Sequence, residues 1–374
     1  MSDPTQPPVY LDHNGTAPVA PEVADAMWPY LTEHFGNPSS LTPQGRAARE
    51  AVEAARERVA ALVGAHPDEI VFTSGGTESN NLAIRGSAAS ASVRVALSSV
   101  VEHPATVQPL TLLEQDGWTV HRMPVDAEGR VAPASVPHGP IGLGTLILAQ
   151  NEVGTVEPVA AIAERVHAAG GVMHADAAQA VGKIPVDVGA LGVDLLSIAG
   201  HKLYAPKGVG ALVVRRGTPL RPVLVGAGQE RGLRPGTENV ASIVGLGAAA
   251  ELAGRVLADE PARQERLREL LWQLLSEGIP GLVRVSSADG CLPNTLMVAV
   301  PDRTGADLLE AAPAVAASTG SACHAGVHTP AATLLAMGVD PRTAVGAVRL
   351  TLGRSTARSD VVLAAEALVS AARR

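Results

Sequence analysis

A lysine and an aspartate in this sequence follow two separate apolar segments and could hold a cofactor between them. Lys202 comes after the apolar segment 193–198, and Asp176 comes after the apolar segment 171–174. Polar residues at the carboxyl ends of neighbouring strands meet at one edge of a sheet, so we expect both side chains to face one cleft. A buried carboxylate needs a partner, so we interpret Asp176 either as a helix N-cap or as the acid that pairs with a protonated pyridinium nitrogen.

A glycine turn supplies a third part of such a site. The segment Ser74-Gly75-Gly76-Thr77-Glu78 lies between a predicted strand and a predicted helix, where backbone N–H groups and a Thr hydroxyl can bind phosphate. It matches neither a dinucleotide fingerprint nor a P-loop. Pyridoxal 5'-phosphate requires a lysine, an acid at its ring nitrogen and a phosphate site, so the sequence predicts this cofactor. We expect Gln179 to reach its phenolic oxygen and His103 to stack on its ring and move protons.

Composition limits the classes of function. Of the 374 residues, 46% are hydrophobic and 18% are charged, and the net charge is −8, which argues against direct binding of nucleic acid. We also find no run of about 18 apolar residues, no secretory signal and no metal motif, and we expect no membrane partner. The two cysteines, Cys291 and Cys323, favour free thiols in a reducing cytoplasm over a disulfide, so a cytoplasmic location is expected.

The pattern of apolar segments predicts an α/β protein with two domains. Short strands alternate with helices of roughly 10–15 residues from about residue 70, which indicates a mostly parallel sheet covered on both faces. Two long helices are expected at 241–258 and 263–277, with a break at Glu260-Pro261. We predict a large domain of residues 13–250 and a small domain formed by residues 1–12 and 251–374.

A series of motifs runs nearly from end to end of the chain. They are Tyr10-Leu11-Asp12, Phe35-Gly36-Asn37-Pro38-Ser39-Ser40, Phe72-Thr73-Ser74-Gly75-Gly76-Thr77-Glu78-Ser79, Glu102-His103, Asn151-Glu152-Val153-Gly154, His174-Ala175-Asp176-Ala177-Ala178-Gln179, Gly200-His201-Lys202, Arg231-Gly232-Leu233-Arg234-Pro235-Gly236-Thr237 and Gly320-Ser321-Ala322-Cys323. With them the chain resembles the cysteine desulfurases of the class V aminotransferase family, in the NifS/IscS branch. The resemblance implies a fold-type I enzyme that depends on pyridoxal phosphate, with a mostly parallel seven-stranded sheet, and normally a homodimer.

The resemblance also implies a role for each matching residue. Lys202 holds the cofactor covalently, Asp176 pairs with its ring nitrogen, and His103 stacks on it as acid and base. The remaining cofactor contacts are Gly76, Thr77 and His201 at the phosphate, Thr237 reaching the phosphate from the other subunit, and Gln179 and Asn151 at the ring or the substrate. Arg349 matches the arginine that binds the substrate carboxylate, a task that suits its planar fork of donors.

Cys323 matches the nucleophile that takes sulfur from L-cysteine as a persulfide for delivery to an acceptor protein. An iron–sulfur scaffold, a tRNA-thiolation protein and a biosynthetic sulfur carrier all remain open as acceptors. The same fold also allows a selenocysteine lyase, a cysteine or cystine lyase or an aminotransferase, and a non-catalytic sulfur-transfer partner is a remote alternative. Ala199 stands where many relatives have Ser or Thr, which removes one hydroxyl from the phosphate site, and His324 and His328 follow Cys323 where the familiar motif has neither.

Overall fold

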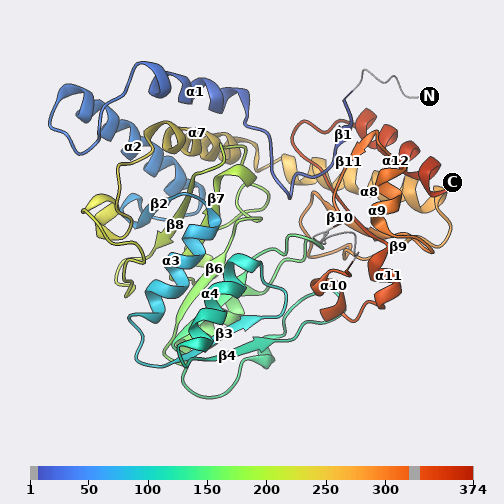
Figure 1. Ribbon diagram of the computed structural model, residues 1–374, viewed down its shortest axis with the longest axis horizontal. Helices are drawn as coiled ribbons and strands as arrows, with labels where there is room; N and C mark the ends of the chain where they lie inside the picture. The colour runs from blue at the N-terminus through green and yellow to red at the C-terminus, as the bar shows by residue number, and fades with distance from the viewer. Residues whose placement is uncertain (1–6, 320–328, 374) are drawn as a thin grey trace.

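The computed structural model describes residues 7–319 and 329–373. Its largest element is a seven-stranded sheet in the order β2-β8-β7-β6-β5-β3-β4 (Figure 1). The pairs β7–β6, β6–β5, β5–β3 and β3–β4 are parallel, whereas β8 runs antiparallel to both of its neighbours. This arrangement confirms the predicted mostly parallel, seven-stranded α/β fold.

The strands are β1 (Val9–Tyr10), β2 (Ile70–Thr73), β3 (Val95–Ser99), β4 (Thr119–Met123), β5 (Leu143–Ile147), β6 (Val172–Asp176), β7 (Leu195–Ala199), β8 (Gly210–Val214), β9 (Val283–Arg284), β10 (Thr295–Ala299), β11 (Val315–Ala316) and β12 (Ala347–Thr351). The α-helices are α1 (Pro21–Thr32), α2 (Pro43–Leu62), α3 (Gly76–Ala88), α4 (Pro104–Gln115), α5 (Val159–Ala168), α6 (Val188–Leu191), α7 (Val240–Val256), α8 (Glu260–Gly278), α9 (Gly305–Glu310), α10 (Ala332–Ala336), α11 (Pro341–Val345) and α12 (Arg358–Ala372).

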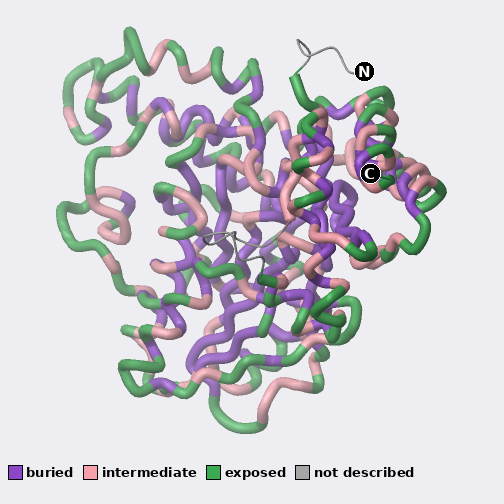
Figure 2. Tube along the Cα trace, turned by 45° about the vertical axis from the view of Figure 1, so that its right-hand side comes forward, coloured by how far each residue is buried: buried purple, intermediate pink, exposed green. Residues whose placement is uncertain are grey.

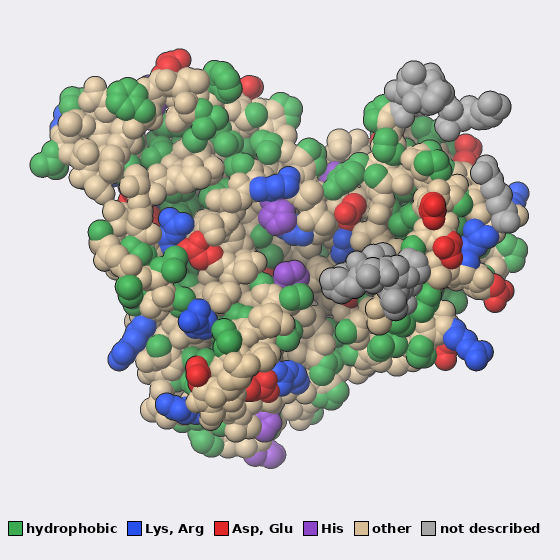
Figure 3. Space-filling model, in the orientation of Figure 1, with side chains coloured by type: hydrophobic (Ala, Val, Ile, Leu, Met, Phe, Trp, Pro, Cys, Tyr) green, Lys and Arg blue, Asp and Glu red, His purple; other side chains and the backbone are tan. Residues whose placement is uncertain are grey.

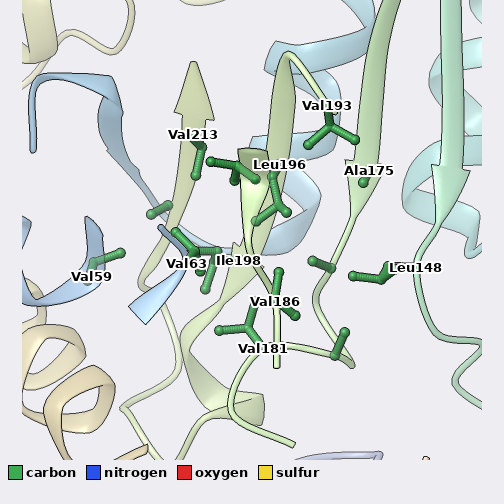
Figure 4. Close-up of a cluster of buried hydrophobic side chains, with 14 of the residues drawn as sticks. Val59, Val63, Leu148, Ala175, Val181, Val186, Val193, Leu196, Ile198 and Val213 are labelled. Carbon is green, nitrogen blue, oxygen red and sulfur yellow. The ribbon is translucent and has the colours of Figure 1, made fainter. Parts of the chain in front are cut away.

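The large sheet is covered by helices on both faces because its strands are apolar on both. Along β7, Leu196 and Ile198 pack in a core shared with α2, α5 and α7, whereas Leu195 points to the opposite face and packs against α3. Side chains alternate between the faces of a strand, so a strand with apolar residues on both faces must be sandwiched. Figure 4 shows part of the first core, where Val59 and Val63 lie close to Ile198 and Val213.

A second core belongs to the smaller domain at the right of Figure 1. There the antiparallel sheet β12-β10-β9 packs with α8, α9 and α12. The short strand β1 pairs in parallel with β11, and Leu11 is fully buried in this second core. The N-terminal strand therefore packs with elements from the C-terminal third of the chain. In Figure 2 buried segments run through both cores, and exposed segments form the outer loops and helices.

The boundary between the two long helices differs from the prediction. We expected a break at Glu260-Pro261, but α7 ends at Val256 and both residues lie in the first turn of α8. Proline is tolerated there because the first-turn N–H groups have no partner within the helix. Within the described residues no single helix is long and apolar enough to cross a membrane, although α7 and α8, bent by 76°, pass that test as a pair.

Candidate active site

A cavity of about 430 Å³ lies at the carboxyl edge of the large sheet, facing the small domain. Its wall contains most of the residues that the sequence predicted for the site: Gly76, Thr77, His103, Asn151, Asp176, Gln179, His201, Lys202 and Arg349. In Figure 3 histidine and basic side chains gather in the hollow between the two domains. The structure therefore brings together side chains that are as far as 273 residues apart in the chain, from Gly76 to Arg349.

Strand ends and helix starts position these residues. Asp176 is the last residue of β6, and Lys202 ends the single 3-10 turn Gly200–Lys202 that follows β7. Gly76 begins α3, and Gly75 before it has a φ of 147°, which only glycine adopts without strain. His103 caps α4 by accepting a hydrogen bond at Nδ1 from the backbone N–H of Ala105, 3.1 Å away.

Asp176 is buried, and polar groups hold it in place. Its Oδ2 accepts a 2.7 Å hydrogen bond from the Asn80 amide, and its Oδ1 accepts a 3.0 Å hydrogen bond from the backbone N–H of Ala178. A turn, and not a helix, follows Asp176, so the N-cap alternative is wrong. Among the described residues Asp176 forms no ion pair within 4.0 Å, which leaves this carboxylate available to a cationic group inside the cavity.

The amine of Lys202 lies against the segment that follows β1. Its Nζ donates to the backbone carbonyls of Asn14 and Gly15, the latter at 2.7 Å. Burial, together with the positive charge of Arg349, lowers the pKa of Lys202 to about 8, and the carboxylates of Asp12 and Asp176 oppose this shift. A larger share of Lys202 is therefore neutral, as a nucleophilic amine must be.

Arg349 crosses from the small domain into the cavity wall. Its Nη2 donates to Asp12 Oδ1 at 2.7 Å, and its Nη1 donates to the carbonyl of Asn151 at 3.1 Å. Its Nε is buried and has no partner among the described residues. Arg349 also lines the cavity, and the planar donors of a guanidinium suit a carboxylate that enters it.

The two histidines of the cavity are held mainly in the neutral state. Burial lowers the pKa of His103; Asp176 opposes this shift and Lys202 adds to it. Since Nδ1 of His103 accepts from Ala105, its neutral form carries the proton on Nε2. Burial and the neighbouring lysines lower the pKa of His201 to about 4, and its Nδ1 lies 3.1 Å from the hydroxyl oxygen of Thr16.

Several functional residues escaped the sequence interpretation, and Asn14 is the most connected of them. Its carbonyl accepts from Gln179 Nε2 at 2.9 Å as well as from Lys202, and its Nδ2 donates to Asn151 and to Thr295 Oγ1. Asn14 thus joins the small-domain strand β10 to the cavity wall. The available signal was an amide side chain two residues after the motif Tyr10-Leu11-Asp12 and directly before Gly15.

Asn80 and Lys183 were missed for a different reason. Asn80 lies one turn after Gly76 on α3, and the position of its amide against Asp176 depends on how α3 packs over β6. Lys183 lies in the turn after Gln179, and its Nζ donates to Gln179 Oε1 at 2.5 Å and to Asn14 Oδ1 at 2.9 Å. Burial, Lys202 and Arg349 lower its pKa well below the usual value.

The cavity fits the predicted phosphorylated pyridine cofactor. A Cβ added to Gly76 would lie 3.3 Å from the Cβ of Ala199, a tight contact, so glycine keeps this corner open at the start of α3. Thr77 and His201 line the same cavity, and the unpaired carboxylate of Asp176 matches a protonated ring nitrogen. The residues of this chain that would hold the cofactor are therefore brought together except for Thr237, with Lys202 available for covalent attachment.

Two predicted residues are not placed in this site. Thr237 is exposed and does not line the cavity formed by this chain. Cys323 lies outside the described residues. The other cysteine, Cys291, is half-buried, donates its S–H to the carbonyl of Val153 at 3.2 Å, and has a pKa raised by burial to about 11.

The chain belongs to the class V aminotransferase family, since the family model described as "Aminotransferase class-V" matches residues 9–363. It is 43% identical over 360 residues to a cysteine desulfurase of Trichormus azollae, with 94% of this chain and 90% of the relative covered. A solved structure described as a NifS-like protein superposes with a TM-score of 0.91 at 34% identity, covering 97% of this chain and 98% of the other. Another, described as SspA in complex with cysteine, has a TM-score of 0.81 at 33% identity and covers 92% and 98%. These findings confirm the resemblance to the NifS/IscS branch.

Proposed function

We propose that this protein is a pyridoxal phosphate-dependent L-cysteine desulfurase, which converts L-cysteine to L-alanine and passes the sulfur atom to Cys323 as a persulfide. The observation that supports it best is the cavity that joins Lys202, the carboxylate of Asp176 and the guanidinium of Arg349. The relative from Trichormus azollae is named a cysteine desulfurase. The reaction balances without an external oxidant, because the transferred sulfur is oxidised while the β-carbon is reduced to a methyl group.

Each side chain in the cavity has a defined task. The bound cofactor would supply the electron sink for the substrate. Arg349, which lines the cavity, binds the substrate carboxylate and so fixes the α-carbon near Lys202. Lys202, whose pKa is about 8, takes the α-proton as a neutral amine, and Asp176 retains the proton on the ring nitrogen. His103 carries its proton on Nε2 and donates or accepts at the cavity wall.

The assembly and the partners follow as part of the proposal. Thr237 lies on the surface, so a second subunit of a homodimer would be needed to bring this hydroxyl to the phosphate. The substrate is L-cysteine, the ligand named for one of the structural neighbours. The persulfide sulfur passes to an acceptor protein for iron–sulfur cluster assembly, tRNA thiolation or another biosynthetic pathway. We propose that the reaction takes place in the cytoplasm, without direct contact to nucleic acid or membrane.

The test is to incubate the purified protein and pyridoxal phosphate with L-cysteine and to quantify alanine, sulfide and labelled persulfide on Cys323. Cys323→Ala should abolish desulfuration, and Cys291→Ala is the matched control that should retain it. Lys202→Ala should lose the visible absorption of the bound cofactor. A wild-type protein that forms no alanine would overturn the proposal, and a Cys323→Ala variant with full activity would indicate a cysteine or selenocysteine lyase.

A further inference from the structure

Lys183 lies behind the wall of the candidate active site and contacts two of its amides. It does not line the large cavity; together with Lys202 it lines a separate cavity of about 10 Å³ on the other side of the wall, with room for roughly one water molecule. The two acceptors of its Nζ in the described residues are Gln179 Oε1 and Asn14 Oδ1, and no carboxylate lies within 4.0 Å of it. No ion pair within the described part of the chain compensates the free-energy cost of burying this amine, so its hydrogen bonds to the two amides must do so.

The chemistry of lysine determines how the neighbouring amide is oriented. Lys183 Nζ donates to Gln179 Oε1, so the oxygen of this amide faces Lys183. The Nε2 group is then turned the other way, and it donates one of its two hydrogens to the carbonyl of Asn14 at 2.9 Å. Gln179 lines the large cavity, so its second N–H is the donor that remains for a group inside it.

The same lysine orients Asn14. Its Oδ1 accepts from Lys183 at 2.9 Å and from Asn294 Nδ2 at 3.0 Å, which leaves Nδ2 to donate to Asn151 and Thr295. The carbonyl of Asn14 also accepts from Lys202. Lys183 Nζ therefore favours one orientation of two amides that line the cavity, those of Asn14 and Gln179.

We infer that Lys183 is a positioning residue that makes Gln179 a hydrogen-bond donor toward the phenolic oxygen of the cofactor. Without Lys183 only the carbonyl of Asn14 would favour this orientation of the Gln179 amide, so a larger share of the amide would flip and present its oxygen, which would repel an ionised phenolic oxygen. The inference rests on the proposed function only for the identity of the cofactor. It assigns to Lys183 no contact with the substrate or the reacting atoms.

The test compares the visible absorption spectrum and the dissociation constant of pyridoxal phosphate in Lys183→Met and wild type. Losing the fixed donor should weaken cofactor binding about tenfold, roughly the effect of one hydrogen bond, and should shift the visible band toward the form with a protonated phenolic oxygen. The same substitution in a Gln179→Leu background should cause no further shift of the band, because Lys183 then has no amide to orient toward the phenolic oxygen.

Each outcome has a defined meaning. An unchanged band and affinity in Lys183→Met would overturn the inference, and an equal shift with and without Gln179 would overturn it in favour of a direct charge effect. If thermal unfolding shows that Lys183→Met does not fold, Gln179→Glu is compared with wild type instead. This variant keeps an acceptor for Lys183 but offers no N–H to the phenolic oxygen, so it should show the same band shift. An unshifted band in Gln179→Glu would also refute the inference. Failure of wild type to bind pyridoxal phosphate would refute the proposed function itself.

Discussion

The low pKa of Lys202 leads to a prediction about how the protein captures its cofactor. With a pKa of about 8 instead of the usual 10.5, about one tenth of Lys202 is neutral at pH 7, roughly 300 times more than for an unperturbed lysine. Burial is the larger cause and the charge of Arg349 is the next. Arg349→Met removes that charge and also releases Asp12 from its 2.7 Å ion pair, and both changes favour the charged form of Lys202.

The expected size of this effect follows from the electrostatics of a partly buried pair. At an effective dielectric constant near 20, losing one nearby charge changes the pKa by about one unit, or about 1.4 kcal/mol. The assay is the pH dependence of the rate at which the apoprotein gains the visible absorption of covalently held pyridoxal phosphate. We expect a midpoint near pH 8 for wild type and near pH 9 for Arg349→Met.

The control removes the same charge elsewhere. Arg342 is exposed on α11, so Arg342→Met should leave the midpoint unchanged. The midpoint is the quantity to compare, because losing Arg349 also weakens the attraction of an anionic cofactor and lowers every rate. A wild-type midpoint near 10.5 would refute the role of burial, and an unchanged midpoint in Arg349→Met would refute the role of the arginine.

Two further predictions concern stability. Arg56 and Glu230 form a buried bidentate ion pair with both N–O distances at 2.8 Å. Arg56→Met leaves the charge of Glu230 without its partner and should lower the free energy of unfolding, measured by chemical denaturation, by about 3–5 kcal/mol. Arg216→Met breaks an exposed pair and should change the free energy of unfolding little, so equal losses in the two variants would contradict the prediction. Glu102 has a pKa raised by burial to about 8, so the folded state holds a proton that the unfolded state releases above about pH 4.5, and stability should fall as the pH rises from 5 to 8. Glu102→Gln should flatten that part of the thermal unfolding profile, and an identical slope in both proteins would argue against it.

The elements of the fold were predictable where the local pattern is strong. The alternation of strands and helices predicted the parallel sheet, because apolar residues on both faces of strands such as β7 require helices on both sides. The break between α7 and α8 was placed three residues too late, because a proline is as compatible with the first turn of a helix as with a break before it. The antiparallel direction of β8 depends on the turn after Lys202 and had no signal of its own.

The candidate site shows the same division. Lys202, Asp176, Gly76 and His103 were identified from residue type at strand ends and helix starts, since the carboxyl edge of a parallel sheet is where loops gather. Asn80 was not, because its contact with Asp176 depends on the rotation of α3 over the sheet. Thr237 lies outside the cavity of this chain, and Cys323 lies outside the described residues.

The sequence by itself predicted the chemical groups of the candidate site: which residue carries the amine and which the carboxylate, because these are properties of side chains in recognisable motifs. Only the tertiary structure decided the pKa values and the hydrogen-bond partners of those groups. The pKa of Lys202 is lowered by burial and by Arg349, 147 residues further along the chain. The hydrogen bonds of the Arg349 guanidinium and of the Gln179 amide likewise depend on partners that are more than a hundred residues away or behind the cavity wall. Burial and hydrogen bonding act through space, so they exist only after the chain has brought Asn14, Lys183 and Arg349 together.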